Sequence, residues 1–368
     1  MKITVVNVYA KTMPMASAYN MSSAPVGDPS TTIIEIITDS EHVGWGEICP
    51  SGPLPQPEHA GSIRADLELL GPTLIGTDPT LIGEVWAAMT GTMDGGIGAK
   101  SAIDIGCWDL LGKATNRRVC DLLGGPLMDP VPTYHVIPIG TPGESAGLAE
   151  RLQDEGITKL QLKAGGRRIE DDIAAATAVA GVVRPGVDLF VDANRGFTVE
   201  QAIQFSQACT GLRFDMEQPC HTYDECAAAK SSLTHPLLLD ECAKDLATVA
   251  KSISSGVANG FGMKLTRVGG LSGMRAIRDL CLATHTPTSF DDSWGGDIIA
   301  AACVHIGSTM PAALSRGAWI SHPYHQLHYD EVNGPRIEGG MVAIPAGGPG
   351  LGLVMPTGCF GDAIASYG

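Results

Sequence analysis

Three acidic side chains stand near the ends of three successive strand-like segments. The segments DLFVDAN, RFDMEQP and PLLLDE carry Asp192, Glu217 and Asp240. Because strand ends of a parallel barrel point into a site at its carboxyl face, we expect the three carboxylates to converge. Their combined charge requires a cation, and an all-oxygen ligand set favours Mg²⁺ or Mn²⁺ over zinc. The sequence therefore predicts a site for one of these divalent cations.

One lysine lies on each side of this set, Lys163 in KLQLKAGG and Lys264 in GMKLTRVGG. By subtraction of residue numbers, the successive intervals from Lys163 through the carboxylates to Lys264 are 29, 25, 23 and 24 residues. Such intervals match one strand–helix unit of a barrel, so the lysines end the second and sixth strands, on opposite sides of the ring. We expect one lysine to remove a proton next to a substrate carboxylate and the other to return it. Desolvation near a metal is expected to lower a lysine pKa for this task.

Further polar candidates follow two of these strands. Asp292, in SFDDSWGGD, is expected to pair with Lys264 or to bind the substrate carboxylate, with Asp291 as the competing assignment. Asn194 lies two residues beyond Asp192 and is expected to support the metal ligands. Glu241, next to Asp240, is expected to point away from the site by strand alternation.

Substrate recognition is predicted at one aromatic side chain and two loops. Trp319, in RGAWISHPY, ends the expected eighth strand, and tryptophan is the best aromatic face for a quaternary ammonium group. A packing role for Trp319 is the alternative. Tyr19 and Gln56 lie in loops rich in proline and glycine, which often close over ligands.

The elements that must position these residues fall into three predicted regions. Residues 1–128 read as strands followed by helices, an α+β capping domain. Residues 129–322 alternate eight strand segments with seven amphipathic stretches, as in a parallel barrel. Residues 323–368 lack this period and are expected to return to the capping domain.

Composition narrows the function classes for the 368-residue chain. A hydrophobic content of 44% with 17% charged residues predicts a large core rather than disorder. The net charge of −16 argues against nucleic acid and anionic membranes as partners. Ten cysteines without a C-x-x-C pair, no export signal and no apolar run of membrane-spanning length predict a cytoplasmic protein with free thiols.

Taken together, these residues resemble the enolase superfamily, in its muconate-lactonizing-enzyme-like branch, over nearly the whole chain. The resemblance implies a (β/α)7β modified TIM barrel with an N-terminal α+β capping domain, Mg²⁺ as cofactor and a homo-oligomer. The family's lysine, Asp–Glu–Asp and lysine pattern is matched by Lys163, Asp192, Glu217, Asp240 and Lys264. The sequence departs from the frequent Lys-x-Lys of strand two, where it has Gln161 two residues before Lys163.

The stretches GMKLTRVGGL, FDDSWGGDIIAAACVHIG and GAWISHPYHQLHYDEVNGPRI are similar to the hydroxyproline betaine 2-epimerases of that superfamily, which also racemise proline betaine. This resemblance implies 1,1-proton transfer through a metal-stabilised enolate. It makes Lys163 and Lys264 the acid and base, and Trp319 the face for the quaternary ammonium.

Three alternatives stay open. The same enolate serves a hydroxyproline dehydratase of the cis-3-hydroxyproline type, which expels a β-hydroxyl group. Racemases of other N-substituted amino acids use the same bases, although GAWISH lacks the Asp-x-Asp of dipeptide epimerases. A non-catalytic binding protein would be expected to have lost a base or a ligand, and all five positions are present.

Overall fold

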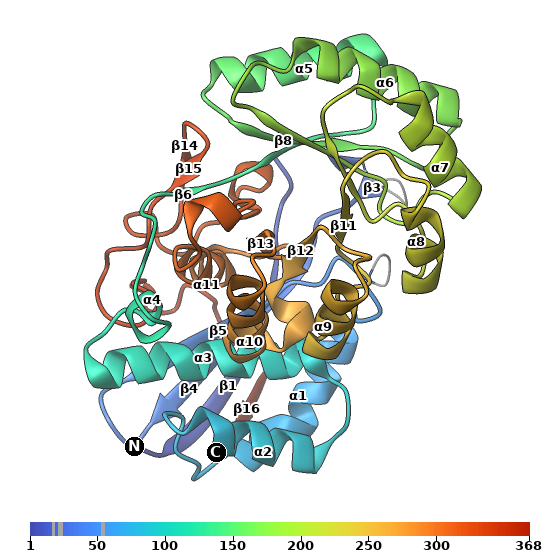
Figure 1. Cartoon of the computed structure of the whole chain (residues 1–368). Coiled ribbons are helices and arrows are strands. Elements are labelled where there is room, and N and C mark those ends of the chain that lie inside the picture. Colours follow the sequence, from blue (N-terminus) through green and yellow to red (C-terminus); the bar gives the residue numbers. More distant parts are fainter. Residues whose placement is uncertain (17–18, 21–24, 53–55) are drawn as a thin grey trace.

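Seven parallel strands form the larger sheet of the computed structural model, which describes residues 1–16, 19–20, 25–52 and 56–368 (Figure 1). Their order is β13-β12-β11-β10-β9-β8-β7, so that strands adjacent in sequence are neighbours in space. The strands are β7 (His135–Ile137), β8 (Lys159–Lys163), β9 (Asp188–Asp192), β10 (Asp215–Glu217), β11 (Leu237–Leu239), β12 (Gly260–Lys264) and β13 (Thr288–Asp291). Parallel neighbours in this order bring their carboxyl ends to one edge of the curled sheet.

Seven helices alternate with these strands. They are α5 (Pro142–Asp154), α6 (Ile169–Val182), α7 (Val199–Ala208), α8 (Tyr223–Lys230), α9 (Leu246–Ser254), α10 (Gly270–Ala283) and α11 (Asp297–Gly307). Three of them begin with a threonine that caps the helix and a partner three residues on: Thr141 with Glu144, Thr198 with Gln201 and Thr222 with Glu225. These reciprocal hydrogen bonds satisfy amide groups that the first turn leaves unpaired.

The segment GAWISH, predicted as the eighth strand, is not a strand of the sheet. Ala318 of this segment forms an isolated parallel bridge to Thr133, and Ser315, two residues before the segment, forms another to Thr288. Thr133 precedes β7 and Thr288 begins β13, so the segment connects the two edges. The physical reason for the broken ladder is Gly317, whose φ of 93° interrupts an extended backbone.

The N-terminal part forms a second, antiparallel sheet in the order β16-β1-β4-β5. Its strands are β1 (Ile3–Thr12), β4 (Ser30–Thr38), β5 (Val43–Ile48) and β16 (Ala365–Tyr367). Helices α1 (Ala60–Leu74), α2 (Ile82–Thr92) and α3 (Ile97–Thr115) accompany it (Figure 1). Because β16 pairs with β1, the end of the chain lies in the N-terminal capping domain.

Short elements complete the connections. They are β2 (Tyr19–Asn20) paired with β3 (Pro25–Val26), α4 (Val119–Leu122), β6 (Val131–Pro132), β14 (Ile337–Glu338), β15 (Met341–Val342) and the 3₁₀ turns Leu265–Val268, Ala312–Leu314 and His322–Tyr324. β15 joins β14 to β6 in a small sheet. Across the described ranges, every helix is too short or too polar to span a bilayer.

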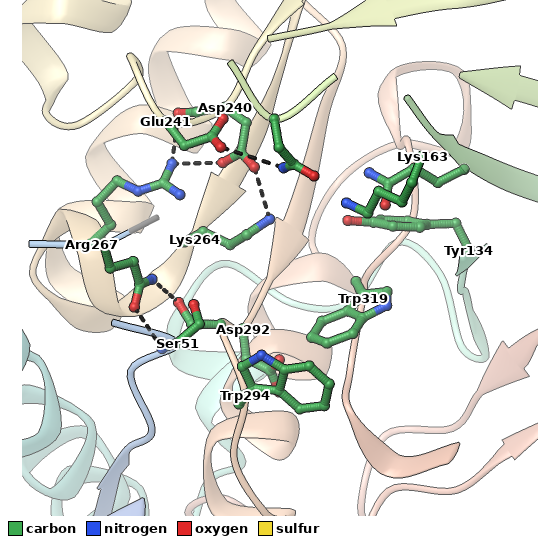
Figure 2. Close-up of a pocket in the computed structure, with 14 residues that line it drawn as sticks. Ser51, Tyr134, Lys163, Asp240, Glu241, Lys264, Arg267, Asp292, Trp294 and Trp319 are labelled. Atoms are coloured by element: carbon green, nitrogen blue, oxygen red, sulfur yellow. Dashed lines mark hydrogen bonds and ion pairs between the residues drawn. The ribbon is translucent and has the colours of Figure 1, made fainter. Parts of the chain in front are cut away.

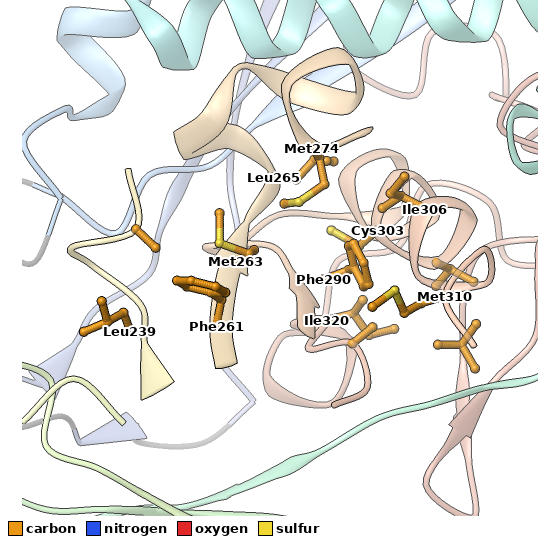
Figure 3. Packing of buried hydrophobic residues seen from close by; sticks show 14 of the residues in the cluster. Leu239, Phe261, Met263, Leu265, Met274, Phe290, Cys303, Ile306, Met310 and Ile320 are labelled. Atoms are coloured by element: carbon orange, nitrogen blue, oxygen red, sulfur yellow. The ribbon is translucent and has the colours of Figure 1, made fainter. Parts of the chain in front are cut away.

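The core of the barrel side is built from alternate strand residues and the helices outside them (Figure 3). Phe261 and Met263 of β12 and Phe290 of β13 are fully buried. Met274 of α10 and Cys303 of α11 belong to the same apolar cluster. Each large apolar side chain buried in this way stabilises the fold by roughly 1.5–3 kcal/mol, which fixes the strands whose ends carry the polar residues.

Helix α3 ties the capping domain to the barrel through a buried carboxylate. Asp104 accepts hydrogen bonds from Trp86 Nε1 at 2.7 Å and from the backbone N–H of Ser272, in the first turn of α10, at 3.0 Å. Trp108 Nε1 donates to Ser272 Oγ at 2.9 Å. Burial raises the pKa of Asp104 to about 6, although these donors act to lower it. The two domains therefore share a polar contact that excludes water.

Candidate active site

A pocket lies at the carboxyl ends of the barrel strands, where the capping domain covers them (Figure 2). It is lined by Ser51, Gln56, Tyr134, Gln161, Lys163, Asn194, Asp240, Glu241, Lys264, Arg267, Asp292, Ser293, Trp294 and Trp319. Both predicted lysines are among these residues and come from different strands, β8 and β12. Ser51 and Gln56, in one loop of the capping domain, also line this pocket.

Lys163, Asp192 and Glu217 stand on three adjacent strand ends. In the sheet register, Asp192 is opposite Lys163 on one side and opposite Glu217 on the other. Lys163 Nζ lies 2.6 Å from Asp192 Oδ2, and both side chains are buried. Gln161 Nε2 donates to Glu217 Oε2 at 2.7 Å. The glutamine that replaces the first lysine of the Lys-x-Lys pattern thus binds a predicted metal ligand with a neutral donor.

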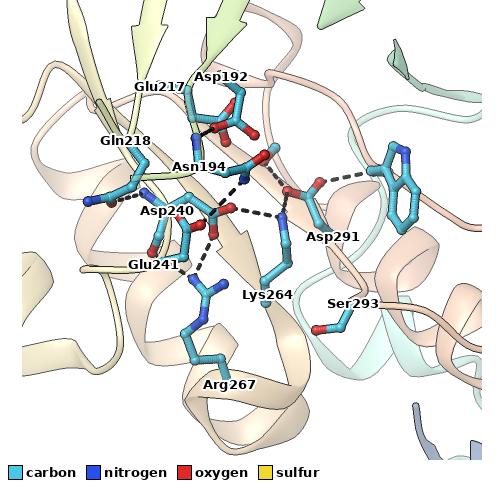
Figure 4. A network of polar contacts seen from close by, with 12 residues as sticks. Asp192, Asn194, Glu217, Gln218, Asp240, Glu241, Lys264, Arg267, Asp291 and Ser293 are labelled. Carbon is cyan, nitrogen blue, oxygen red and sulfur yellow. Dashed lines mark hydrogen bonds and ion pairs between the residues drawn. The ribbon is translucent and has the colours of Figure 1, made fainter. Parts of the chain in front are cut away.

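Asp240 follows β11 directly and is held by two cations (Figure 4). Arg267 Nη1 donates to Asp240 Oδ1 at 2.7 Å, and Lys264 Nζ lies 3.3 Å from Asp240 Oδ2. Burial alone raises the pKa of this carboxyl, but Arg267 and Lys264 outweigh burial and lower the pKa to about 2. Asp240 is therefore ionised across the physiological range.

Lys264 is paired with Asp291, its register partner on β13. Lys264 Nζ lies 3.2 Å from Asp291 Oδ2, and Asp291 also accepts from Ser289 Oγ at 2.8 Å. Burial lowers the pKa of Lys264, but Asp240 and Asp291 outweigh it and hold the pKa above its usual range. The two carboxylates thus oppose the lowering of the lysine pKa that desolvation favours.

Asp292 lines the pocket but does not pair with Lys264, which corrects that part of the prediction. Both carboxylate oxygens are buried and lack a hydrogen bond of normal geometry within the described ranges. Burial, then Glu47 and Asp291, raise the pKa of Asp292 well above its usual range, while the backbone of Ser321 lowers it slightly. A protonated carboxyl in a pocket can donate a hydrogen bond to a substrate carboxylate.

Glu241 points into the pocket rather than away from it, contrary to the prediction from strand alternation. β11 ends at Leu239, so the alternation does not extend to Glu241. Asn194 Nδ2 donates to Glu241 Oε1 at 3.4 Å, and the Asn194 backbone N–H donates to Asp192 Oδ1 at 2.8 Å. Burial, followed by repulsion from Asp240 and Asp192, raises the pKa of Glu241 to about 7.

The three predicted metal ligands are close enough to repel one another electrostatically. Burial and then Asp192 and Asp240 raise the pKa of Glu217 well above its usual range. A Cβ at Gly262 would lie 2.5 Å from Glu217 Oε1, so glycine leaves the space that this carboxylate occupies. With Asp192 drawn to Lys163 and Asp240 to Arg267, no three acidic, imidazole or thiol groups in the described part of the chain are spaced to hold an ion. The oxygen donor set and its charge nevertheless fit Mg²⁺.

Trp319 lies in the pocket as part of an aromatic group. Its ring meets that of Trp294 edge to face, with centroids 5.4 Å apart, and stacks on Tyr324 at 5.6 Å. Its backbone N–H donates to Asp291 Oδ1 at 2.9 Å. The carboxylate that binds Lys264 therefore also fixes the backbone from which Trp319 projects.

Of the two loop residues, Gln56 reaches the pocket. Its amide donates to Ser293 Oγ and accepts from the backbone N–H of Ser51 at 3.1 Å. Tyr19 belongs to β2, but its side chain lies outside the described part of the structure. Gln56 thus connects the capping domain to the barrel.

Sequence reasoning missed several pocket residues, including Tyr134, Arg267 and Trp294. The signal for Arg267 was its position three residues beyond Lys264, on a 3₁₀ turn at the strand end. Tyr134 lies in the predicted strand segment TYHVIPI, directly before β7, and Trp294 follows β13. Their positions come from chain closure around the sheet, which local sequence does not encode.

Two family models match this chain. One, described as "Enolase C-terminal domain-like", covers residues 144–357. The other, described as "Mandelate racemase / muconate lactonizing enzyme, N-terminal domain", covers residues 2–124.

Individual proteins are similar over most or all of their length. A cis-3-hydroxy-L-proline dehydratase from Roseibium aggregatum is 35% identical over 100% of both chains. An N-succinyl-L-Arg/Lys racemase from Bacillus cereus is 28% identical over 74% of each chain. A solved structure from Roseovarius nubinhibens ISM, described as an enolase superfamily member complexed with magnesium, gives a TM-score of 0.95 at 31% identity, covering 100% of this chain and 99% of that one.

Proposed function

Because the chain belongs to the enolase superfamily, in its mandelate racemase/muconate-lactonizing branch, we propose that it is a Mg²⁺-dependent dehydratase of a cis-3-hydroxyproline-type amino acid. The observation that carries this proposal is the lysine pair in one pocket, with Lys163 buried and Lys264 partly exposed, on either side of the carboxylates. The choice of elimination over racemisation is supported by the full-length similarity to a cis-3-hydroxy-L-proline dehydratase.

The two lysines differ in a way that suits elimination. Lys264 is held protonated by Asp240 and Asp291, so it can donate a proton to a departing hydroxyl group. Lys163 is then the base that removes the α-proton, a role that its neutral amine performs. The contact of Lys163 Nζ with Asp192 Oδ2 at 2.6 Å keeps this nitrogen at the strand end, within the pocket.

Mg²⁺ held by Asp192, Glu217 and Asp240 would stabilise the negative charge that develops on the substrate carboxylate. Two residues that are not metal ligands hold two of these carboxylates in place. Arg267 binds Asp240, and Gln161 binds Glu217. Asp292, with its raised pKa, is placed to donate a hydrogen bond to the substrate. These residues orient the substrate so that its α-carbon faces the amines.

A second candidate function is the racemisation or epimerisation of proline betaine and hydroxyproline betaine. The observation in its favour is the aromatic pair Trp319 and Trp294 at the pocket wall. A betaine has no N–H group to donate, so an aromatic face is the recognition element that suits it. In this case the second lysine would return a proton to the α-carbon instead of protonating a leaving group.

Product mass separates the two functions. The Mg²⁺-loaded protein is incubated separately with cis-3-hydroxy-L-proline and with hydroxyproline betaine, and products are analysed by mass spectrometry. Loss of one water from the free amino acid supports the dehydratase. Unchanged mass with inverted α-carbon configuration in the betaine supports the epimerase and contradicts the proposed dehydration.

A further inference from the structure

Three thiols meet behind the ends of β10 and β11, a cluster formed by Cys220, Cys226 and Cys242. Cys226 lies on α8, and its Sγ and that of Cys242 both approach the side-chain amide of Gln218. Cys226 Sγ lies 3.7 Å from the carbonyl oxygen of Cys220. Cys220 and Cys226 are buried, while Cys242 is partly exposed. Two of the three side chains are thus enclosed, and the third can meet a small solute.

One buried amide, that of Gln218, links this thiol cluster to a predicted metal ligand. Figure 4 shows Gln218 beside that ligand, Asp240. Gln218 Nε2 lies 3.0 Å from Cys242 Sγ and 3.6 Å from Cys226 Sγ. On the other side of the amide, Gln218 Oε1 accepts from the backbone N–H groups of Asp240 at 3.0 Å and of Cys242 at 3.1 Å. A change at the sulfur atoms therefore reaches the backbone of Asp240 through a single side chain.

We propose that the thiol cluster is a redox-sensitive site, in which a peroxide joins Cys226 and Cys242 as a disulfide and weakens Mg²⁺ binding at Asp240. A peroxide can reach Cys242 because it is the partly exposed thiol of the cluster. Cys226 and burial raise the pKa of Cys242, so this first oxidation is slow and sets the rate of disulfide formation. Hydrogen peroxide accepts two electrons from this sulfur, forming a sulfenic acid and one water.

The thiol of Cys226 then attacks the oxidised sulfur, so that the sulfur–sulfur bond forms and the sulfur–oxygen bond breaks. The oxygen leaves as a second water with the proton of Cys226. In total, two thiols and one hydrogen peroxide give one disulfide and two waters. A thiol reductant reverses the reaction by exchange.

The disulfide would strain the loop that holds Asp240. A sulfur–sulfur bond of about 2.0 Å is much shorter than any contact between two unbonded sulfur atoms, so Cys242 must move toward α8. Gln218 would lose its contact with the thiols and with it the fixed position of the Asp240 backbone. Loss of such supporting contacts lowers metal affinity by about 10-fold or more.

The test is oxidation of the full chain with one to a few equivalents of hydrogen peroxide, followed by peptide mass mapping and Mg²⁺ calorimetry. We expect a Cys226–Cys242 linked peptide, about 10-fold weaker Mg²⁺ binding, and recovery of both after reduction. Cys226→Ser and, independently, Cys242→Ser should abolish the linked peptide and the loss of affinity. Cys359→Ser, at another partly exposed cysteine, should behave like the parent protein.

Two results would overturn the proposal. One is oxidation that leaves these thiols free or converts them to sulfinic acids without any linked peptide. The other is a linked peptide with unchanged Mg²⁺ affinity. Neither readout requires turnover, so the outcome does not depend on which substrate the protein uses.

Discussion

The ammonium of Lys264 lies 3.2 Å from the carboxylate of Asp291, its register partner on the neighbouring strand. Asp291 also accepts the backbone N–H of Trp319 at 2.9 Å. One buried carboxylate therefore sets both the charge of a predicted acid and the position of a pocket aromatic. The carboxylate of the neighbouring Asp292, which the sequence favoured as the partner of Lys264, makes neither contact, although the Asp292 backbone N–H donates to the carbonyl oxygen of Trp319 at 3.1 Å.

Asp291→Asn should move the pH dependence of catalysis. Asp291 raises the pKa of Lys264, so removing its charge lowers that pKa. The limb of the pH–rate profile that reports Lys264 should shift to lower pH by roughly 1 unit or more.

Asp292→Asn is the matched control for this shift. The pKa of Asp292 is raised well above its usual range, so its replacement removes little charge near neutral pH. A shift caused by Asp292→Asn but not by Asp291→Asn would contradict the assignment of Asp291 as the partner of Lys264.

Gly262→Ala should weaken Mg²⁺ binding without removing a ligand. The added methyl carbon would lie 2.5 Å from Glu217 Oε1 and must displace that carboxylate. We expect about 10-fold lower affinity by calorimetry. Gly140→Ala is the control, because its nearest contact would be an ordinary 3.5 Å. Equal affinities in the two variants would argue against Glu217 as a ligand.

Asp104→Asn should change how stability depends on pH. Burial raises the pKa of Asp104 from 3.8 to about 6, so the folded protein binds this proton more tightly than the unfolded chain. Stability from this group is therefore fully present below about pH 4 and is lost as pH rises through about 6.

Two pKa units correspond to a change on the order of 3 kcal/mol in the free energy of unfolding. Denaturant unfolding at several pH values should show this fall in the parent protein and a flatter curve in Asp104→Asn. Parallel curves for the two proteins would mean that Asp104 does not titrate in this range.

Trp319→Ala separates the two substrate classes. A desolvated tryptophan contributes roughly 2 kcal/mol to binding a quaternary ammonium, which is about 30-fold in affinity. We expect that loss for betaine ligands if the epimerase is correct, and a much smaller loss for a free hydroxyproline. Equal losses for both ligands, measured by calorimetry, would indicate that Trp319 serves only packing.

The sequence was sufficient to predict the strand ends and what they carry, because strand–helix spacing is regular in this architecture. The seven strands of the parallel sheet and the antiparallel capping sheet follow from it. The sequence did not predict the residue at which each strand ends. Alternation misplaced Glu241, since β11 ends two residues earlier, and Gly317 broke the expected eighth strand into bridges.

The partners of the site residues depend on contacts far apart in sequence. Arg267 binds Asp240 across 27 residues, and Gln161 binds Glu217 across 56. Such pairs follow from the order of strands in the sheet and not from local pattern. The same is true of the pairing of Lys264 with Asp291 rather than Asp292.

The most direct test of the two-lysine site is α-proton exchange. Proton NMR in D₂O follows the α-proton of cis-3-hydroxy-L-proline, proline betaine and hydroxyproline betaine with the Mg²⁺-loaded protein. We predict loss of the α-proton signal of at least one of these, and about 100-fold or more slower loss in Lys163→Ala. Undiminished loss in both Lys163→Ala and Lys264→Ala would contradict the central claim.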